Sequence, residues 1–134
     1  MRRTYLREWQ AGRVAETDMS SHELVDSWLT APEAAEQLGI DVGRVRQLLR
    51  ERQLLAARRG DDGSLRIPAA FVHDGKVLKG LPGTLTLLAD CGFDDGAALR
   101  WLFTADESLP GTPVQALVEN RGTEVRRRAQ ALAF

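Results

Sequence analysis

The stretch of residues 30–68 constrains the fold of this chain more than any other, because it carries start and stop signals for two short helices. It opens on the tetrapeptide TAPE at residues 30–33, which has the spacing of a capping box. In that motif a threonine and a glutamate each bond the backbone amide of the other residue. Gly39 then predicts the end of the first helix, since glycine adopts a left-handed conformation at little cost. Asp41 predicts the cap of the second helix.

The second predicted helix has two distinct faces. Four aliphatic side chains recur at i, i+3, i+6 and i+7, which predicts one buried face: Val42, Val45, Leu48 and Leu49. The opposite face collects Gly43, Arg46, Gln47 and Arg50. Guanidinium and carboxamide groups read guanine and adenine edges in a major groove, and a glycine permits close approach. We therefore expect Arg46, Gln47 and Arg50 to read or approach bases, with Arg44 at the edge of this face contacting phosphate.

Two short runs rich in arginine follow the second helix, at residues 56–59 and 64–67, on either side of the turn sequence GDDG. This pattern predicts a β-hairpin. A hairpin directly after a recognition helix is a wing, and we expect Arg58, Arg59 and Arg66 to hold phosphate. The alternative for these arginines is an ordinary solvated surface, but the coincidence of helix spacing, outward arginines and a basic hairpin favours DNA.

The spacing of the small and aliphatic residues supports the same interpretation. Ala35, Gly39, Val45 and Leu48 stand at the separations of a helix-turn-helix unit. Alanine lets two helices cross closely, glycine makes the turn, and the aliphatic side chains fill the crossing. Together with the hairpin, this stretch resembles the winged helix-turn-helix of excisionase and MerR-type proteins, and the resemblance implies DNA binding.

Length and composition set limits on the rest. At 134 residues and 43% hydrophobic, the chain is predicted to form one domain, or two very small ones sharing a core. The single cysteine, Cys91, excludes an internal disulfide and suits a reducing cytoplasm. No apolar run reaches the length of about 18 residues that a spanning helix needs. We therefore expect a cytoplasmic protein, neither membrane-spanning nor secreted.

The net charge of −1 hides strong local patterning. Residues 1–15 carry four arginines against one glutamate, and residues 16–41 carry seven acids and no lysine or arginine. Residues 44–66 hold seven arginines against three acids. The overall balance does not indicate a nucleic-acid ligand, but the patch at 44–66 does, with modest and salt-sensitive affinity.

The chain divides into three predicted regions. Residues 1–21 lack a clear period and are expected to form a flexible N-terminal arm, with exposed hydroxyls that a kinase could modify. Residues 22–79 form the winged helix-turn-helix domain. Residues 80–134 form a helical C-terminal region, where Asp94 and Thr112 are the predicted caps. The expected fold class is thus mostly α, with a small hairpin wing. The three arginines at residues 126–128, near the C-terminal end of this region, either contact DNA or form a solvated helix end.

Catalytic chemistry is poorly supplied. His22 and His73 lie far apart in the sequence, and neither has metal-ligand spacing. There is no phosphate-cradling glycine loop, no nucleophile elbow and no Cys-x-x-Cys pair. The sequence predicts neither an enzyme nor a bound metal or cofactor.

The C-terminal half carries a closer resemblance, most specific in RWLFT at residues 100–104 and RRRAQALAF at residues 126–134. Over about residues 29–134 the chain is similar to an actinobacterial family of small winged-helix DNA-binding proteins, typified by a mycobacterial substrate of a Ser/Thr protein kinase. The resemblance implies a winged helix-turn-helix followed by a helical C-terminal region, DNA binding, and regulation by a Ser/Thr kinase. We expect the chain to be a transcription regulator that associates with the nucleoid.

A second resemblance supports an alternative function. Arg100-Trp101-Leu102, with Thr112-Pro113 and Ala116-Leu117 after it, is similar to the partner-binding domain of Xre-type antitoxins. The alternative is an interaction module whose C-terminal helices bind a protein partner. Residues 80–134 also hold more apolar positions than one small core needs, so we expect an outward apolar patch. A homodimer is favoured over a toxin as its partner.

Overall fold

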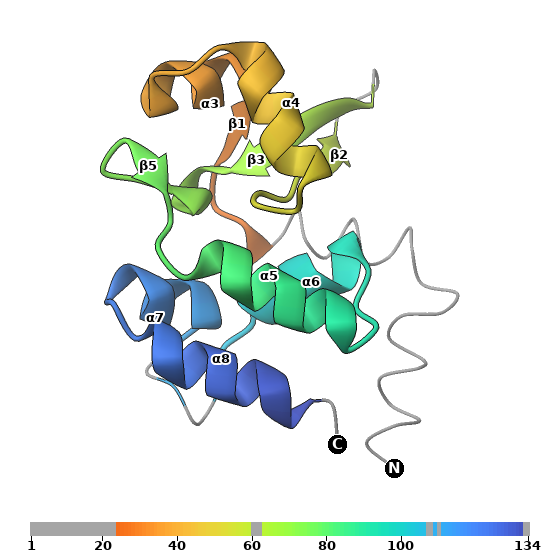
Figure 1. The fold of residues 1–134 in the computed structure, drawn as a ribbon, viewed down its shortest axis with the longest axis vertical. Coiled ribbons are helices and arrows are strands. Elements are labelled where there is room, and N and C mark those ends of the chain that lie inside the picture. The colour runs from red at the N-terminus through yellow and green to blue at the C-terminus, as the bar shows by residue number, and fades with distance from the viewer. Residues whose placement is uncertain (1–23, 60–62, 107–108, 110, 133–134) are drawn as a thin grey trace.

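The computed structural model describes residues 24–59, 63–106, 109 and 111–132, and helices make up most of their regular structure (Figure 1). This agrees with the predicted mostly α class. The predicted flexible arm at 1–21 and the hairpin turn residues 60–62 lie outside the described residues. No helix in the described part of the chain is long and apolar enough to cross a membrane.

The helix-turn-helix begins and ends as its sequence signals predict. Strand β1 (Trp28–Thr30) leads into α3 (Ala31–Leu38), and α4 (Val42–Arg50) follows after a short turn. The capping box is complete: the Thr30 amide donates to Glu33 Oε1 at 2.8 Å, and the Glu33 amide donates to Thr30 Oγ1 at 3.2 Å. Gly39 is left-handed at φ 69°, and Asp41 Oδ1 accepts from the Arg44 amide at 2.8 Å.

The wing is a three-stranded antiparallel sheet with β3 at its centre. Strands β2 (Ala57–Arg59) and β3 (Ser64–Pro68) form the predicted hairpin, and β1 pairs with the other edge of β3. The register places Leu29 opposite Ile67, and both side chains are buried. The segment directly before α3, residues 28–30, is thus a strand of the wing sheet.

A second, smaller hairpin connects the wing to the C-terminal region. After the 3₁₀ turn η1 (Ala69–Phe71), strand β4 (Val72–His73) pairs with β5 (Lys76–Val77). The turn residues Asp74 and Gly75 have φ of 53° and 74°, which is the geometry of a tight two-residue hairpin turn. This hairpin forms a two-stranded sheet of its own, separate from the wing sheet.

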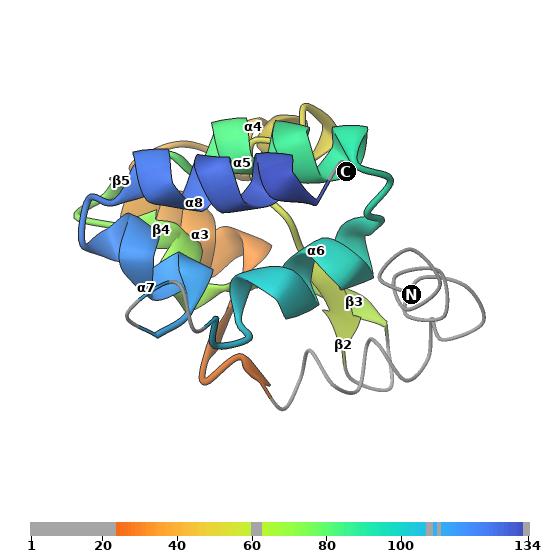
Figure 2. The same ribbon diagram turned by 90° about the horizontal axis from the view of Figure 1, so that it is seen from below.

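Four helices form the C-terminal region: α5 (Leu81–Asp90), α6 (Asp95–Leu102), α7 (Pro113–Val118) and α8 (Gly122–Ala131). Helices α5 and α8 lie side by side, as Figures 1 and 2 both show. The predicted caps are present. Asp94 Oδ1 accepts from the Ala97 amide at 2.8 Å, and Thr112 Oγ1 accepts from the Gln115 amide at 3.1 Å.

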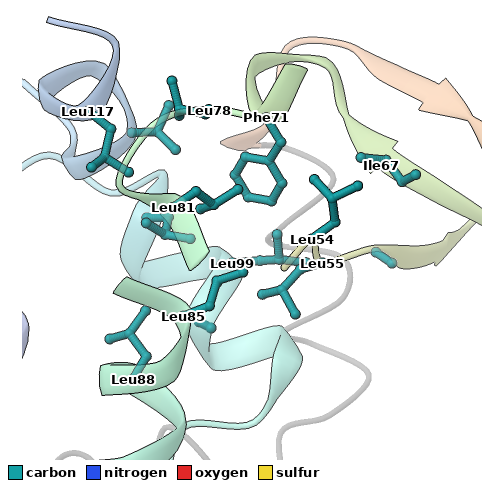
Figure 3. Packing of buried hydrophobic residues seen from close by; sticks show 14 of the residues in the cluster. Leu54, Leu55, Ile67, Phe71, Leu78, Leu81, Leu85, Leu88, Leu99 and Leu117 are labelled. Carbon is teal, nitrogen blue, oxygen red and sulfur yellow. The ribbon is translucent and has the colours of Figure 1, made fainter. Parts of the chain in front are cut away.

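One hydrophobic core runs through both predicted domains. Leu54 and Phe71 from the winged helix-turn-helix lie in the same cluster as Leu99 from α6, and all three are almost fully buried (Figure 3). The rings of Phe71 and Phe103 have centroids 5.7 Å apart. The regions 22–79 and 80–134 are therefore joined by packing, which agrees with the expectation of small units sharing a core.

This core also removes the expected apolar patch on residues 80–134. Seven of the large side chains proposed for it are buried: Leu81, Leu85, Leu88, Leu99, Leu102, Val114 and Leu117. Among the described residues, Val118 is the only large hydrophobic side chain in the exposed class, at 39%. Four others of the set are half-buried against the same core: Leu87, Trp101, Phe103 and Leu132. The described residues therefore give the expected patch little support, because most of the large side chains pack into the core.

Candidate nucleic-acid interface

Helix α4 presents one apolar and one polar face. Val45 and Leu48 are buried, and Val42 and Leu49 are half-buried. The predicted reading face is exposed along its length: Gly43, Arg46, Gln47 and Arg50. Arg44 is exposed as well. The structure thus confirms which face of α4 is buried, and it brings the predicted base-reading side chains together on the outer face.

The exposed side chains of α4 differ in how they are held. Within the described residues, no hydrogen bond or ion pair engages the guanidinium groups of Arg44, Arg46 or Arg50, so these groups are available to a ligand. Gln47 is held: its Nε2 donates to Oε2 of Glu51 at 3.0 Å. Glu51 is the cap residue at the end of α4, and the sequence analysis did not single it out.

The wing arginines are partly engaged within the hairpin. Arg58 is exposed, and its Nη1 donates to the carbonyl oxygen of Gly63 at 3.1 Å, across the hairpin from β2 to the turn. Arg66 is half-buried on the central strand; its Nη1 donates to the carbonyl oxygen of Leu65 at 3.2 Å and to Ser64 Oγ. Arg59 ends β2, and its side chain lies outside the described part.

The start of α3 is electrostatically linked to the wing. Hydrogen bonds from the backbone and side chain of Thr30 hold the pKa of Glu33 below its ordinary value, and the positive charge of Arg66 adds to this. Thr30 and Arg66 are partners in the register of β1 and β3. The ionised capping carboxylate therefore lies within the electrostatic reach of Arg66.

The end of α4 is closed by a turn that the sequence analysis missed. The Gln53 amide donates to the carbonyl oxygen of Leu48 at 2.9 Å, and the Arg52 amide donates to that of Leu49 at 3.2 Å. This is the Schellman pattern, in which the left-handed residue is usually glycine. Here it is Arg52, with φ 56°. No glycine marks this position, so the sequence offered no signal for the turn.

The arginine triplet of α8 lies away from this surface. Arg126, Arg127 and Arg128 are exposed on α8, and α4 and α8 lie toward opposite ends of the long axis (Figure 1). Arg128 pairs with Asp106, with 3.4 Å between Nη2 and Oδ2. The sequence left this triplet open between a DNA contact and a solvated helix end. Its placement favours the second, because α8 lies toward the end of the long axis opposite to α4.

The described residues hold neither a cluster of metal ligands nor an activated thiol. Within the described residues, no group of three His, Cys, Asp or Glu side chains is placed to hold a metal ion. Cys91 is half-buried, and desolvation raises the pKa of its thiol, with the charge of Asp90 adding to the shift. A thiol with a raised pKa is a poor nucleophile.

Comparison with known proteins gives matches to both parts of the chain. A family model described as "DNA-binding protein Rv2175c, wHTH domain" matches residues 20–72. A second, described as "Rv2175c C-terminal domain of unknown function", matches residues 78–133. The DNA-binding protein Rv2175c of Mycobacterium tuberculosis (strain ATCC 25618 / H37Rv) is 45% identical, over 77% of this chain and 78% of that protein.

The fold agrees with that of a solved relative. The NMR structure of Rv2175c superposes with a TM-score of 0.72 at 42% identity, covering 81% of this chain and 82% of that one. These matches confirm the family resemblance and the winged helix-turn-helix fold. They give no support to the antitoxin alternative.

Proposed function

Because this chain belongs to the Rv2175c family of winged helix-turn-helix DNA-binding proteins, we propose that it is a transcriptional regulator that places α4 in the major groove of duplex DNA. The observation that carries this proposal is the outer face of α4. It combines three exposed groups able to read base edges, those of Arg46, Gln47 and Arg50, on a helix that neighbours a basic hairpin.

The residues have distinct proposed roles. Arg50 and Arg46 donate to guanine O6 and N7, and Gln47 reads adenine through both atoms of its amide. Gly43 lets the helix backbone approach the groove, because it presents no side chain there. Arg44 contacts phosphate at the edge of the face. These groups specify the sequence, whereas phosphate contacts position the protein.

The wing supplies the phosphate contacts. Arg58, Arg59 and Arg66 lie on the paired strands β2 and β3, and this hairpin neighbours α4. The hydrogen bond from Arg58 to Gly63 and those of Arg66 within β3 brace the hairpin in its free form. In the complex we expect these guanidinium groups to share their donors with phosphate oxygens, since each guanidinium carries five N–H groups.

The test is selection followed by titration. A site is selected from a random duplex library, and its binding constant and that of random duplex are measured at several salt concentrations. A winged helix that reads bases gives a preferred site, and both binding constants fall as salt rises. A binding constant indifferent to salt would overturn the proposal. Loss of repression or activation of a reporter carrying the selected site, when the gene is deleted, tests regulation.

Pairing of two copies on DNA is a separate proposal. One module of this size usually binds specifically when two half-sites lie about one helical turn apart. Val118 is the only large hydrophobic side chain in the exposed class among the described residues of the C-terminal region, so we expect pairing on DNA rather than in free solution. Sedimentation with and without a selected palindromic site tests this; a monomer in both conditions rejects it.

A Ser/Thr kinase partner stays a prediction from the family resemblance. The hydroxyl groups considered for it, those of Thr4, Thr17, Ser20 and Ser21, lie outside the described residues. A cytoplasmic location at the nucleoid follows from the proposed function, and imaging of a fluorescent fusion tests it. We propose no catalytic activity for the chain.

A further inference from the structure

The end of α4 places an acidic side chain on an otherwise basic surface. Glu51 is the only acidic residue in the segment 42–51, and it is exposed. Its Oε2 accepts a hydrogen bond from Gln47 Nε2 at 3.0 Å. A carboxylate next to a DNA-binding face repels phosphate, so its presence there calls for a physical reason.

The hydrogen bond orients the amide of Gln47. A glutamine that reads adenine accepts from N6 with Oε1 and donates to N7 with Nε2. Nε2 carries two hydrogens, so one can serve Glu51 while the other serves the base. The flipped amide would place Oε1 against the carboxylate, where both atoms are acceptors. Glu51 therefore favours one of the two orientations of Gln47.

The backbone of Glu51 is itself well held. Its amide donates to the carbonyl oxygen of Gln47 at 2.9 Å, and the closing turn at Arg52 follows directly. Arg52 Nη1 lies 3.0 Å from Asp95 Oδ1 on α6, so the C-terminal region anchors this turn. The carboxylate thus projects from a fixed point at the end of the helix.

We propose that Glu51 is a positioning residue that sets the base specificity of α4. It orients Gln47 for reading adenine. Its negative charge lowers the affinity of the protein for DNA, whatever the DNA sequence. This inference rests on the proposed function, because it assumes that α4 enters the major groove. A mere helix-stabilising contact between residues four apart would affect unfolding and leave sequence discrimination unchanged.

Two substitutions separate the hydrogen bond from the charge. Glu51→Gln removes the charge and keeps an amide oxygen that accepts from Gln47, whereas Glu51→Ala removes both. We expect both variants to bind random duplex about 2- to 5-fold more tightly, the range of an exposed charge interaction. Glu51→Ala should also reduce the affinity ratio of selected to random duplex by about 5-fold. Glu51→Gln should keep that ratio.

Control variants distinguish a failure of this inference from a failure of the proposed function. Asp90→Asn removes an exposed negative charge at the end of α5 and should change neither affinity. In a Gln47→Ala background, Glu51→Ala should no longer alter the ratio. If Glu51→Ala keeps the wild-type ratio while Arg50→Ala lowers it, the inference is overturned and the proposed function stands. If Arg50→Ala also keeps the ratio, the placement of α4 in the groove is wrong.

Discussion

The Arg52 guanidinium donates to the carboxylate of Asp95 across 3.0 Å, and this contact joins the end of the recognition helix α4 to the start of α6. Three other helices end in the same pair of closing hydrogen bonds, with Gly39, Gly92 or Asn120 at the left-handed position. In α4 an arginine occupies that position instead. The long side chain gives a contact between the two regions that glycine could not make.

This relationship predicts that two substitutions at Arg52 differ in their effect on stability. Arg52→Ala loses the ion pair and stays left-handed, and it should cost less than about 1 kcal/mol of unfolding free energy, because both partners are about half exposed. Arg52→Gly also loses the ion pair but relieves the left-handed backbone, so it should be more stable than Arg52→Ala by about 1 kcal/mol. Urea unfolding of both variants measures the difference; equal stabilities would show that the backbone is not strained.

The shared core predicts that both regions unfold together. Leu54→Ala in the winged helix-turn-helix and Leu99→Ala in α6 should each lower the unfolding free energy by about 2–5 kcal/mol, because each leaves a cavity in one cluster. Circular dichroism and tryptophan fluorescence should show a single, coincident transition in both variants. Two separate transitions would mean that the regions are independent domains.

The wing predicts the salt dependence of binding. The seven arginines of residues 44–66 should neutralise roughly 4–6 phosphates, giving a log–log salt slope near −4 to −5. Replacing both Arg58 and Arg59 by alanine should reduce the magnitude of the slope by about 2. It should also weaken binding to all DNA sequences by the same factor. Titrations at several salt concentrations measure it, and an unchanged slope would remove these two residues from the interface.

The exposed face of α4 predicts that its substitutions reduce discrimination between selected and random duplex. Arg50→Ala should narrow the free-energy gap between selected and random duplex by about 1–3 kcal/mol, the worth of one bidentate base contact. Arg127→Ala on α8 is the matched control, because it removes an exposed arginine at the far end of the molecule. Competition titrations measure the gap. If Arg127→Ala narrowed the gap more than Arg50→Ala does, the DNA would lie on α8 and not on α4.

The capping box predicts a pH-dependent stability. Thr30→Ala should cost about 1 kcal/mol, because the Glu33 amide loses its partner. The pKa of Glu33 is lowered in the folded state, so its stabilisation is present above the ordinary glutamate pKa and is lost as pH falls through the folded value. In Glu33→Gln the unfolding free energy should therefore fall less steeply as the pH is lowered. If this variant and the wild type lose stability equally at low pH, other carboxylates cause that loss.

The local structure around α3 and α4 could be predicted from sequence because its causes are local. A cap bonds an amide three residues away, a left-handed glycine closes a turn, and a period of 3.6 residues separates the two faces of a helix. Thr30, Gly39 and Asp41 therefore marked their helix ends correctly. The exposure of Arg46, Gln47 and Arg50 followed from the same periodicity.

Contacts between distant segments were decided by the tertiary structure alone. Whether Leu81 or Leu117 faces water depends on which distant segments pack over it. The spacing of residues along the chain does not predict those contacts. Some of the apolar side chains of residues 80–134 were therefore expected to face outward, although most of the large ones close onto the core. The pairing of β1 with β3 and the contact between Arg52 and Asp95, 43 residues apart, likewise arise only when the chain has folded.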